Sequence, residues 1–414
     1  MAQTLDVYLD DNAVGVLSLD SQRQFSFQYA QSWLDNKEAI PLSLRLPLQA
    51  DAFDDDRTRI FFTNLLPESG LRSAIARKLG ISEQNDFALL EAIGGECAGA
   101  VSLLTDDMTP VTESEYKSLD DAELNALIRD MPERPMLAGE TGIRLSLAGA
   151  QNKMPVWFDG DRIKIPIKGS PSSHILKPPI PGIEFTVENE AFCMELASRQ
   201  GLPVPLVQIL QKEIPLYLVK RYDRREGASG NLQRVHQEDF CQALGVLPEA
   251  KYEAEGGPGL ADCFEIVRKN SIRPTSDISA LLNWTIFNAL IGNADAHAKN
   301  VSFLLTENGP ELAPFYDLIC TAVYPQFAER MAMKIGGENR PNWIIKRKWQ
   351  AFAEEVGISF RLVQSRLKSA SAGMADQAVI VVREYQEVYG DNKIYEEIIK
   401  VINTNCDKVQ RIFS

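Results

Sequence analysis

Residues 276–317 constrain the fold of this chain more than any other segment of its sequence. Apolar residues recur at helical spacing over 278–290. Ser276 and Asp277 can cap the start of that helix, and Gly292 supplies a stop signal at its end. A short polar loop follows. The sequence therefore predicts a buried helix that holds this loop in a fixed position.

The polar loop leads into a predicted two-stranded ribbon. Residues 301–315 are typical of a hairpin of two short strands around a turn at 306–309. Asp295 and Asn300 precede this hairpin, and Asp317 follows it. Because a hairpin returns the chain to where it started, we expect the three side chains to lie close together.

The order of these three side chains is what phosphoryl transfer from ATP requires. A loop Asp can accept the proton of the attacking hydroxyl, an Asn five positions on can hold Mg²⁺, and a later Asp can bridge metal and phosphates. By this interpretation Asp295 is the catalytic base, and Asn300 and Asp317 are the metal ligands of a kinase that uses ATP and Mg²⁺. The competing interpretation is a polar turn without chemistry, since Asp and Asn are common turn residues.

A second group of residues fits the same reaction. Lys177 ends a short strand, and the two prolines that follow it stop that strand. A lysine that projects from a strand is how protein kinases grip the α- and β-phosphates. A helix predicted at 187–200 comes next, and Glu190 is our candidate for the carboxylate that pairs with Lys177, with Glu188 and Glu195 as alternatives.

A loop of small residues precedes two strands predicted at 154–158 and 162–167. Small residues let backbone N–H groups approach phosphate oxygens closely, and the loop stands ahead of the strand that ends in Lys177. We therefore interpret it as a phosphate-binding loop. Its members are Ala148, Gly149, Ala150, Gln151, Asn152 and Lys153.

The chain is expected to cross between two lobes after the strands predicted at 204–210 and 216–220. Lys220, Arg221 and Tyr222 lie at this crossing. Backbone groups there can bind the adenine edge, and the Tyr222 ring can pack against the base. Because Lys220 is basic, we expect backbone rather than side-chain recognition of adenine.

The fold class predicted from these elements is α+β. Residues 1–105 form a β-rich N-terminal subdomain with a helical stretch at 58–79, and residues 106–142 form an acidic linker with connecting helices. Residues 143–222 form the mostly β small lobe of a bilobal protein-kinase-like fold, and residues 223–414 form its larger, helical lobe. In that lobe, helical spacing is found at 349–356, 360–367, 375–388 and 394–413.

Composition argues against several other classes of protein. A net charge of −14 disfavours broad direct binding to nucleic acid, because nonspecific affinity comes from Lys and Arg that neutralise phosphates. The one basic run, 346–348, is interpreted as a solvated helix end. Six scattered cysteines indicate reduced thiols in a cytoplasmic protein. Without a signal-like start or a run of ~18 apolar residues, we expect neither export nor a membrane span.

Further motifs accompany the site residues in a fixed order along the chain. They are Phe61 to Pro67, Gly99 to Val101, Ser146 to Lys153, Ile175 to Pro178, Asn189-Glu190, Lys220 to Arg224, Gln237 to Phe240, Asn293 to Asn300 and Phe315 to Asp317. Together they resemble the HipA family of bacterial serine/threonine kinase toxins over essentially the whole chain. Several linked motifs in the family's order make the resemblance specific.

The resemblance implies a protein kinase toxin that slows growth and promotes persistence. Its partner would be HipB, a small helix-turn-helix antitoxin, and operator DNA would be bound for autorepression mainly through HipB. A translation component such as glutamyl-tRNA synthetase would be the substrate. By the same resemblance Ser146 is the autophosphorylation site. Tyr316, His297 and Lys299 are further candidates for the nucleotide site.

Autophosphorylation at Ser146 has a physical consequence. A phosphate adds roughly −1.5 to −2 charges beside the place where the nucleotide's own phosphates must sit. The loop should then be expelled and ATP binding lost, so the kinase would switch itself off.

His297 and Lys299 each have two interpretations. Either cation could stabilise charge on the transferring phosphoryl group. His297 could instead brace the catalytic loop through hydrogen bonds, and we favour that role for it, while Lys299 stays open.

Two other functions compete with a protein kinase toxin. A lipid or small-molecule kinase is one, because the catalytic loop also resembles those of phosphatidylinositol kinases; the acidic charge and the lack of a basic membrane-facing patch disfavour it. The other is a noncatalytic corepressor that acts with HipB. The intact set of Lys177, Asp295, Asn300 and Asp317 disfavours this second alternative.

Overall fold

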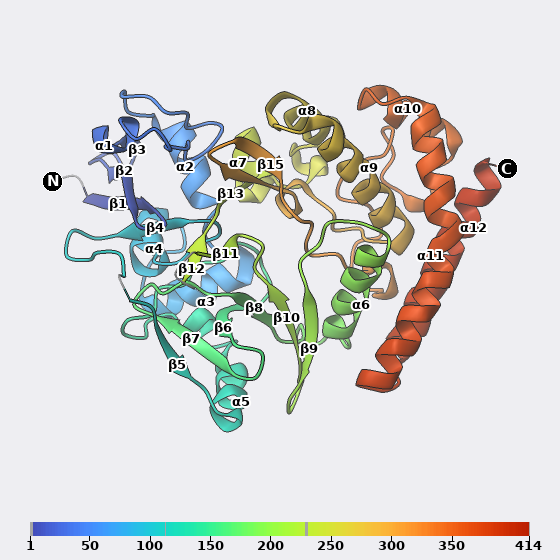
Figure 1. Ribbon diagram of the computed structural model, residues 1–414, viewed down its shortest axis with the longest axis horizontal. Coiled ribbons are helices and arrows are strands. Elements are labelled where there is room, and N and C mark those ends of the chain that lie inside the picture. The colour runs from blue at the N-terminus through green and yellow to red at the C-terminus, as the bar shows by residue number, and fades with distance from the viewer. Residues whose placement is uncertain (1–2, 112, 228–230, 414) are drawn as a thin grey trace.

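A computed structural model describes residues 3–111, 113–227 and 231–413 of the protein. Met1 and Ala2, which begin the predicted N-terminal subdomain, and Ser414, which ends the predicted larger lobe, lie outside these residues. Figure 1 shows a β-rich N-terminal part in blue, a green sheet beside it, and a helical part that ends in two long red helices. The fold is α+β and bilobal, as predicted.

The N-terminal subdomain is built on a four-stranded antiparallel sheet with the order β3-β2-β1-β4. Its strands are β1 (Gln3–Leu9), β2 (Asn12–Leu19), β3 (Phe25–Tyr29) and β4 (Val101–Leu104). Its helices are α1 (Gln31–Leu34), α2 (Asp55–Thr63), α3 (Ser69–Leu79) and α4 (Asp86–Ile93). Alternate residues of β1 are buried, which is the period of a strand with one face on a core.

The single helical stretch predicted at 58–79 is wrong. The chain forms α2 and α3 instead, and residues 64–68 between them are not helical. Pro67 explains the break, because proline lacks an N–H and its ring clashes with the preceding turn of a helix. The break matters for function, since this segment contacts the predicted phosphate loop.

The small lobe is a six-stranded antiparallel sheet with the order β5-β7-β6-β8-β10-β9. Its strands are β5 (Glu115–Ser118), β6 (Met154–Phe158), β7 (Ile163–Ile167), β8 (His174–Lys177), β9 (Val207–Gln211) and β10 (Pro215–Lys220). The strand predicted at 204–210 begins later, after the prolines at 203 and 205.

The predicted linker at 106–142 contains more than connecting helices. Helix α5 (Asp121–Asp130) is present there, but β5 is also present and pairs with β7, so this interval supplies the edge strand of the small-lobe sheet. The domain boundaries themselves stay a prediction.

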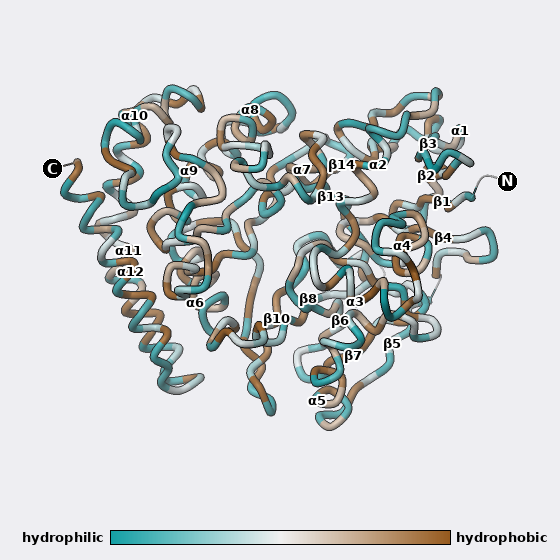
Figure 2. The backbone as a smooth tube through the Cα atoms, turned by 180° about the vertical axis from the view of Figure 1, so that it is seen from behind, coloured by the Kyte–Doolittle hydropathy of each residue, from teal (hydrophilic) through white to brown (hydrophobic). Residues whose placement is uncertain are grey.

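The larger lobe is helical. Its helices are α7 (Phe240–Leu244), α8 (Leu260–Asn270), α9 (Pro274–Ile291), α10 (Lys346–Glu355), α11 (Phe360–Tyr389) and α12 (Lys393–Phe413). Helix α6 (Thr186–Arg199) lies in the interval predicted as the small lobe and packs against β9 and β10, and also against α11. The helical patterns at 360–367 and 375–388 belong to one continuous helix, α11. Figure 2 shows apolar and polar residues alternating along α11 and α12, as expected for helices with one buried face.

Short elements complete the fold. A three-stranded sheet has the order β13-β14-β15, with β13 (His236–Asp239), β14 (Ser302–Thr306) and β15 (Gly309–Leu312); β11 (Arg224–Glu226) pairs with β12 (Leu232–Arg234). The 3₁₀ turns are η1 (Pro135–Leu137), η2 (Pro248–Ala250), η3 (Glu253–Glu255), η4 (Ala298–Asn300), η5 (Thr321–Val323) and η6 (Pro341–Trp343). The hairpin predicted at 301–315 is therefore present, with a shorter return strand.

The predicted cap of α9 is wrong. The helix begins at Pro274, which is favoured at the first helical position, so Ser276 and Asp277 lie inside its first turns. The Asp277 carboxylate instead accepts the backbone N–H of Leu312 at 2.9 Å. This bond ties the start of α9 to the ribbon that leads to Asp317.

Strand β10 separates two hydrophobic cores. Leu216 and Leu218 face the core shared with the N-terminal subdomain, whereas Tyr217 and Val219 face the core of the helical lobe. Because Tyr217 pairs with Lys177 across the sheet, Lys177 also faces α6 and the helical lobe.

The state of the cysteines agrees with the sequence prediction. All six cysteines are buried and free. Within residues 3–111, 113–227 and 231–413, no helix is both long and apolar enough to cross a membrane. The basic run 346–348 forms the first turn of α10, with Lys346 and Arg347 exposed.

Candidate active site

The loop after α9 is held by its own asparagines. Helix α9 ends at Gly292 in the left-handed conformation, as its sequence predicts. Asn293 Nδ2 donates to Asn288 Oδ1 at 2.8 Å, and Asn293 Oδ1 accepts the Asp295 N–H at 3.0 Å. Asn300 Nδ2 donates to the Asp295 carbonyl at 3.0 Å. Asp295 and Asn300 are thereby fixed on one turn.

Asp317 lies opposite this turn, beyond the ribbon. Its φ of 53° is in the left-handed region, which non-glycine residues rarely adopt and which is concentrated at functional sites. Its Oδ1 accepts a hydrogen bond from Lys177 Nζ at 2.5 Å. Burial opposes ionisation of Asp317, but Lys177 and Lys153 lower its pKa to about 2, so the carboxylate is charged at neutral pH.

Lys177 joins the two lobes of the site. Its Nζ pairs with Glu190 of α6 at 2.7 Å as well as with Asp317, and its side chain is only 7% exposed. Burial disfavours the charged ammonium, yet the two carboxylates outweigh burial and raise the pKa of Lys177. The Lys177 ammonium therefore stays charged, which a lysine that grips phosphates requires, whereas burial raises the pKa of Glu190 despite the opposing charge of Lys177.

The structure decides between the three glutamates proposed as partners. Glu190 contacts Lys177, whereas Glu195 pairs with Arg199 on the surface of α6 at 2.7 Å. Glu188 has no ion pair among the described residues. Glu190 is thus the partner, as favoured.

The donor set fits Mg²⁺. Asn300 uses its NH₂ group in the bond to Asp295, which leaves Oδ1 to accept a ligand, and Asp317 keeps a second carboxylate oxygen beside its contact with Lys177. Within the described part of the chain, no group of three or more His, Cys, Asp or Glu side chains forms a metal cage. Mg²⁺ bound to nucleotides typically uses only one or two protein oxygens, with phosphates and waters as the other ligands.

The predicted phosphate loop docks on the N-terminal subdomain. Gly149 has a φ of +107°, and its carbonyl accepts the Glu68 N–H at 3.2 Å. Lys153 Nζ reaches back to the Ala148 carbonyl at 2.6 Å. Because the φ of Gly149 is one that residues with a Cβ rarely adopt, the closed loop favours glycine at position 149.

Ser146 lies just before this loop and is completely buried. Its hydroxyl donates to the Leu65 carbonyl at 2.8 Å, and its N–H donates to the Glu96 carbonyl at 2.9 Å. In this conformation the Ser146 oxygen cannot be reached by a phosphoryl donor.

Two aromatic rings line the crossing between the lobes. Tyr222 stacks on Tyr316, with ring centroids 5.6 Å apart. Tyr316 donates to the Lys299 carbonyl at 2.8 Å, so it also supports the catalytic loop. The N–H groups of Lys220 and Arg221 are already donated to other carbonyls of the chain, so backbone recognition of adenine there would rely on carbonyl oxygens.

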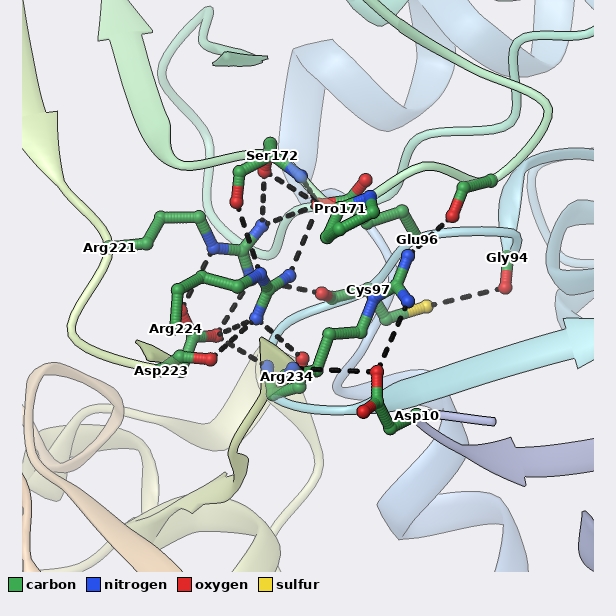
Figure 3. Close-up of polar contacts among 12 residues, drawn as sticks. Asp10, Gly94, Glu96, Cys97, Pro171, Ser172, Arg221, Asp223, Arg224 and Arg234 are labelled. Carbon is green, nitrogen blue, oxygen red and sulfur yellow. Dashed lines mark hydrogen bonds and ion pairs between the residues drawn. The ribbon is translucent and has the colours of Figure 1, made fainter. Parts of the chain in front are cut away.

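The Arg221 side chain points away from the nucleotide site. Figure 3 shows Arg221 and Arg224 converging with Asp223 on Glu96 of the N-terminal subdomain. Glu96 Oε1 contacts Arg221 at 3.2 Å and Arg224 at 3.1 Å, and all four residues are buried. Burial opposes ionisation, but Arg224, Arg234 and Arg221 lower the pKa of Glu96. This buried cluster holds the segment that crosses between the lobes in place.

His297 and Lys299 are both buried beneath the catalytic loop. Lys299 Nζ contacts Asp239 at 2.6 Å and Asn64 Oδ1 at 2.8 Å, which commits its ammonium to protein groups. His297 lies with Nε2 4.0 Å from Asp295 Oδ1, and burial lowers its pKa. The Lys299 contacts brace the loop, whereas the His297 side chain makes no hydrogen bond with the described residues, so the bracing by hydrogen bonds expected of it is not seen. A direct role for either residue at phosphate stays a prediction.

One cavity of about 1070 Å³ gathers the predicted residues. It is lined by Ala148, Gly149, Ala150, Gln151, Asn152, Lys153, Lys177, Glu190, Lys220, Arg221, Tyr222, Asp295, His297, Lys299, Asn300, Tyr316 and Asp317. All predicted nucleotide-site residues therefore lie around the same space, and Ser146 does not line it. A volume of this order accommodates a nucleotide.

Sequence reasoning missed residues that reach the cavity from other elements. Glu68 and Lys251 form an ion pair at 2.8 Å, and Tyr252 contacts Asp295. The available signal was the pair Gly256-Gly257 after this segment, because adjacent glycines mark a tight turn. Nothing in the sequence indicated where that turn packs.

A bilobal fold that pairs a strand lysine with a helix glutamate, and faces them with an Asp–Asn–Asp set, defines a protein-kinase-like class. Comparison with known families narrows the class. Residues 5–104 match the HipA N-terminal domain, and residues 145–382 match the HipA-like C-terminal domain. The chain belongs to the HipA family, which confirms the resemblance found in its motifs.

Several relatives of this chain are kinases by name. It is 42% identical to the putative kinase Y4mE of Sinorhizobium fredii over 94% of both chains. It is 33% identical to the serine/threonine-protein kinase toxin HipA of Shewanella oneidensis, over 88% of this chain and 86% of the relative. The structure of the Shewanella oneidensis HipA, HipB and operator DNA complex contains a similar chain, with a TM-score of 0.87 and 28% identity over 99% of both chains.

Proposed function

We propose that this chain is an ATP-dependent serine/threonine protein kinase. The observation that carries the proposal is the buried Lys177, paired with Glu190 at 2.7 Å and with Asp317 at 2.5 Å, in the cavity that Asp295 and Asn300 also line. The kinase names of the relatives support the same activity.

In the proposed reaction each lobe supplies different groups to the site. Lys177 and the loop at 148–153 hold the phosphates of ATP, and Asn300 and Asp317 hold Mg²⁺, which neutralises phosphate charge when it is bound. Asp295 accepts the proton of the acceptor hydroxyl. Asp295 suits this role because its side chain is 54% exposed and therefore accessible to a protein substrate.

The nucleotide base is proposed to lie at the crossing between the lobes. Tyr222 offers a ring beside the adenine, and the carbonyl oxygens of Lys220 and Arg221 can accept from its amino group. The charge on the Lys220 side chain is not needed for this recognition, because that side chain is exposed.

Self-inactivation at Ser146 is part of the proposal. The buried hydroxyl must leave its contact with Leu65 to be phosphorylated. A phosphoserine carries roughly −1.5 to −2 charges and cannot return beside a carbonyl oxygen. The loop that follows would then stay displaced, and ATP binding would be lost.

We extend the proposal to the biological role by membership in the family. The chain acts as the toxin of a toxin-antitoxin pair in the cytoplasm, where six free cysteines fit the reducing conditions. Its partner is a HipB-type antitoxin, through which it joins operator DNA and autorepression. The substrate is a translation component such as glutamyl-tRNA synthetase, and its modification slows growth and promotes persistence.

Transfer of label from γ-³²P-ATP to the purified chain in the presence of Mg²⁺ tests the kinase proposal. We expect incorporation on Ser146, located by mass spectrometry, and no incorporation in Asp295→Asn or Lys177→Met. Asp161→Asn is a matched control, because Asp161 is an exposed aspartate on the distant turn between β6 and β7. Its labelling should equal that of the wild type.

Three outcomes oppose the proposal. Label in Asp295→Asn equal to the wild type would remove Asp295 from the chemistry. Label that appears only in added phosphatidylinositol vesicles would select a lipid kinase. No labelling and no ADP formation by the wild type would leave the noncatalytic corepressor.

A further inference from the structure

The hydroxyl of Tyr252 contacts the proposed catalytic base. It donates to Asp295 Oδ1 at 2.9 Å, a normal hydrogen-bond length. The other carboxylate oxygen, Oδ2, receives no hydrogen bond from the residues that the structure describes. We infer that Tyr252 is a positioning residue that fixes one oxygen of Asp295 and leaves the other for the acceptor hydroxyl. The inference rests on the proposed kinase function.

Tyr252 is itself held in place from several sides. Its ring meets the His297 ring edge to face, with centroids 5.3 Å apart, and Lys251 Nζ lies 5.3 Å from the Tyr252 ring centre. The following residue, Glu253, bonds through its N–H to the Ala332 carbonyl and through Oε2 to the Lys334 N–H at 2.6 Å. These contacts leave the phenol little freedom to rotate away from Asp295.

The turn after Tyr252 is equally fixed. A Cβ on Gly257 would lie 2.0 Å from the Ala250 carbonyl and would clash with the backbone around Tyr252. The chain can close this tightly only with glycine there. The phenol is therefore delivered by a rigid turn and not by a freely moving loop.

The protonation state of Tyr252 supports the same role. Burial and the neighbouring Asp295 carboxylate raise the pKa of Tyr252, so the phenol keeps its proton at physiological pH. A neutral phenol can donate to a carboxylate throughout the reaction. It does not compete with Asp295 as a base.

The proposed step balances without a change at Tyr252. The acceptor oxygen bonds to the γ-phosphorus, and the bond from that phosphorus to the bridging oxygen breaks. ADP takes the electron pair of the broken bond, and the acceptor proton moves to Asp295 Oδ2. Fixing Oδ1 restricts rotation of the carboxylate, so Oδ2 is oriented before the acceptor arrives.

The same residues connect the base to the phosphate loop. Lys251, next to Tyr252, pairs with Glu68 at 2.8 Å, and both residues are largely buried. The backbone N–H of Glu68 holds the carbonyl of Gly149 in the loop. If the loop moves away from Glu68, the ion pair beside Tyr252 loosens. Phosphorylation of Ser146 would then disturb the position of Asp295 as well as nucleotide binding.

Substitution of Tyr252 by Phe removes the hydroxyl and keeps the ring. We expect the rate constant for self-labelling at saturating Mg-ATP to fall about 10-fold to 100-fold, because a misoriented base reacts slowly. The ATP concentration for half-maximal rate, and the Kd of a fluorescent ATP analogue, should change by less than about twofold, since Tyr252 acts on the base and not on the phosphates.

Tyr116→Phe is the matched control. Tyr116 is also a partly buried tyrosine whose hydroxyl bonds to an oxygen, the Pro171 carbonyl at 3.0 Å, but it lies on β5 away from the cavity. Its self-labelling rate should match the wild type. A purely structural loss would lower the rate equally in both variants and would overturn the inference.

Three other results also overturn the inference. The first is an unchanged self-labelling rate in Tyr252→Phe. The second is a faster rate in this variant, which would mean that the phenol occupies the place of the acceptor. The third is a weaker affinity of the variant for the ATP analogue with an unchanged rate. If the wild type itself forms neither phosphoprotein nor ADP, the proposed function fails instead, so the two failures are distinguishable.

The connection to the phosphate loop has its own test. Lys251→Met removes the ion pair with Glu68 and keeps the aliphatic stem. It should lower the rate about threefold alone and have no further effect in a Tyr252→Phe background, because residues that act as a unit are not additive. Fully multiplicative effects would show that Lys251 does not act through Tyr252.

Discussion

Burial and nucleotide binding shift the pKa of the Lys153 ammonium in opposite directions. Burial lowers the pKa of Lys153 to about 8, although the nearby Asp317 carboxylate opposes this effect. Phosphate groups of ATP would favour the charged form again. The residue is therefore protonated at neutral pH but close to titration.

The affinity for nucleotide should depend on pH through this residue. Below pH 8 Lys153 already carries its proton, whereas above pH 8 binding must take up a proton, so the affinity falls as the pH rises. Fluorescence titration with an ATP analogue between pH 7 and pH 9 should show this decline. In Lys153→Met we expect weaker binding that no longer changes over this range. A wild-type affinity that is flat from pH 7 to pH 9 would contradict the role of Lys153.

The four side chains proposed to bind Mg-ATP and to act as the base were the part of the site that could be predicted from the sequence. Lys177, Asp295, Asn300 and Asp317 stand in a characteristic order, and that order predicts their convergence. Tyr252 could not be found in this way, because its role depends on a contact with Asp295 that only the tertiary fold creates.

Among the structural elements, the segment at the lobe crossing depends most on a distant partner. Glu96 lies in the loop before β4, yet its side chain contacts Arg221 and Arg224, and its carbonyl accepts the N–H of Ser146. Glu96 thus holds the crossing segment through its carboxylate and the start of the phosphate loop through its backbone carbonyl.

Replacement of Glu96 by Gln should destabilise the protein strongly. The two arginines would share only Asp223, and breaking a buried ion pair on one side costs about 3 kcal/mol or more. Glu184→Gln is the comparison, since Glu184 pairs with Lys393 on the surface and should cost less than about 1 kcal/mol. Urea unfolding measures both values. Equal costs would contradict a special role for Glu96.

The errors in the predicted elements have specific causes. Helices with a clear apolar period were found, but the period hid the break at Pro67. Strand β5 was missed because its residues are mostly exposed and its strand conformation comes from pairing with β7. The cap of α9 was misplaced because Asp277 bonds to the ribbon and not to its own helix.

Over the whole molecule, the N-terminal subdomain is joined to the helical lobe by buried polar contacts. Glu238 on β13 accepts from Ser43 Oγ at 2.6 Å and from the Leu44 N–H at 2.9 Å. His236 bonds to the Leu42 carbonyl at 2.8 Å. Burial raises the pKa of Glu238 from 4.5 to about 7, although the hydrogen bonds from Ser43 and Leu44 favour the charged carboxylate.

The sign of the pH effect follows from that shift. Because the folded-state pKa is above the unfolded one, stability present below pH 4.5 is lost as the pH rises toward 7. Glu238→Gln keeps a neutral side chain and should avoid this loss. Relative to the wild type, its free energy of unfolding should gain about 2 kcal/mol between pH 5 and pH 8. An offset that does not change with pH would contradict the prediction.

Segments from both lobes are proposed to form one site for Mg-ATP. Crystals grown with a nonhydrolysable ATP analogue and Mn²⁺ in place of Mg²⁺ test it directly, because anomalous scattering locates the metal. We predict Mn²⁺ at about 2.2 Å from Asn300 Oδ1 and from an Asp317 oxygen, with phosphates on Lys177 and the γ-phosphate facing Asp295. Metal and nucleotide bound away from these four side chains would contradict the account.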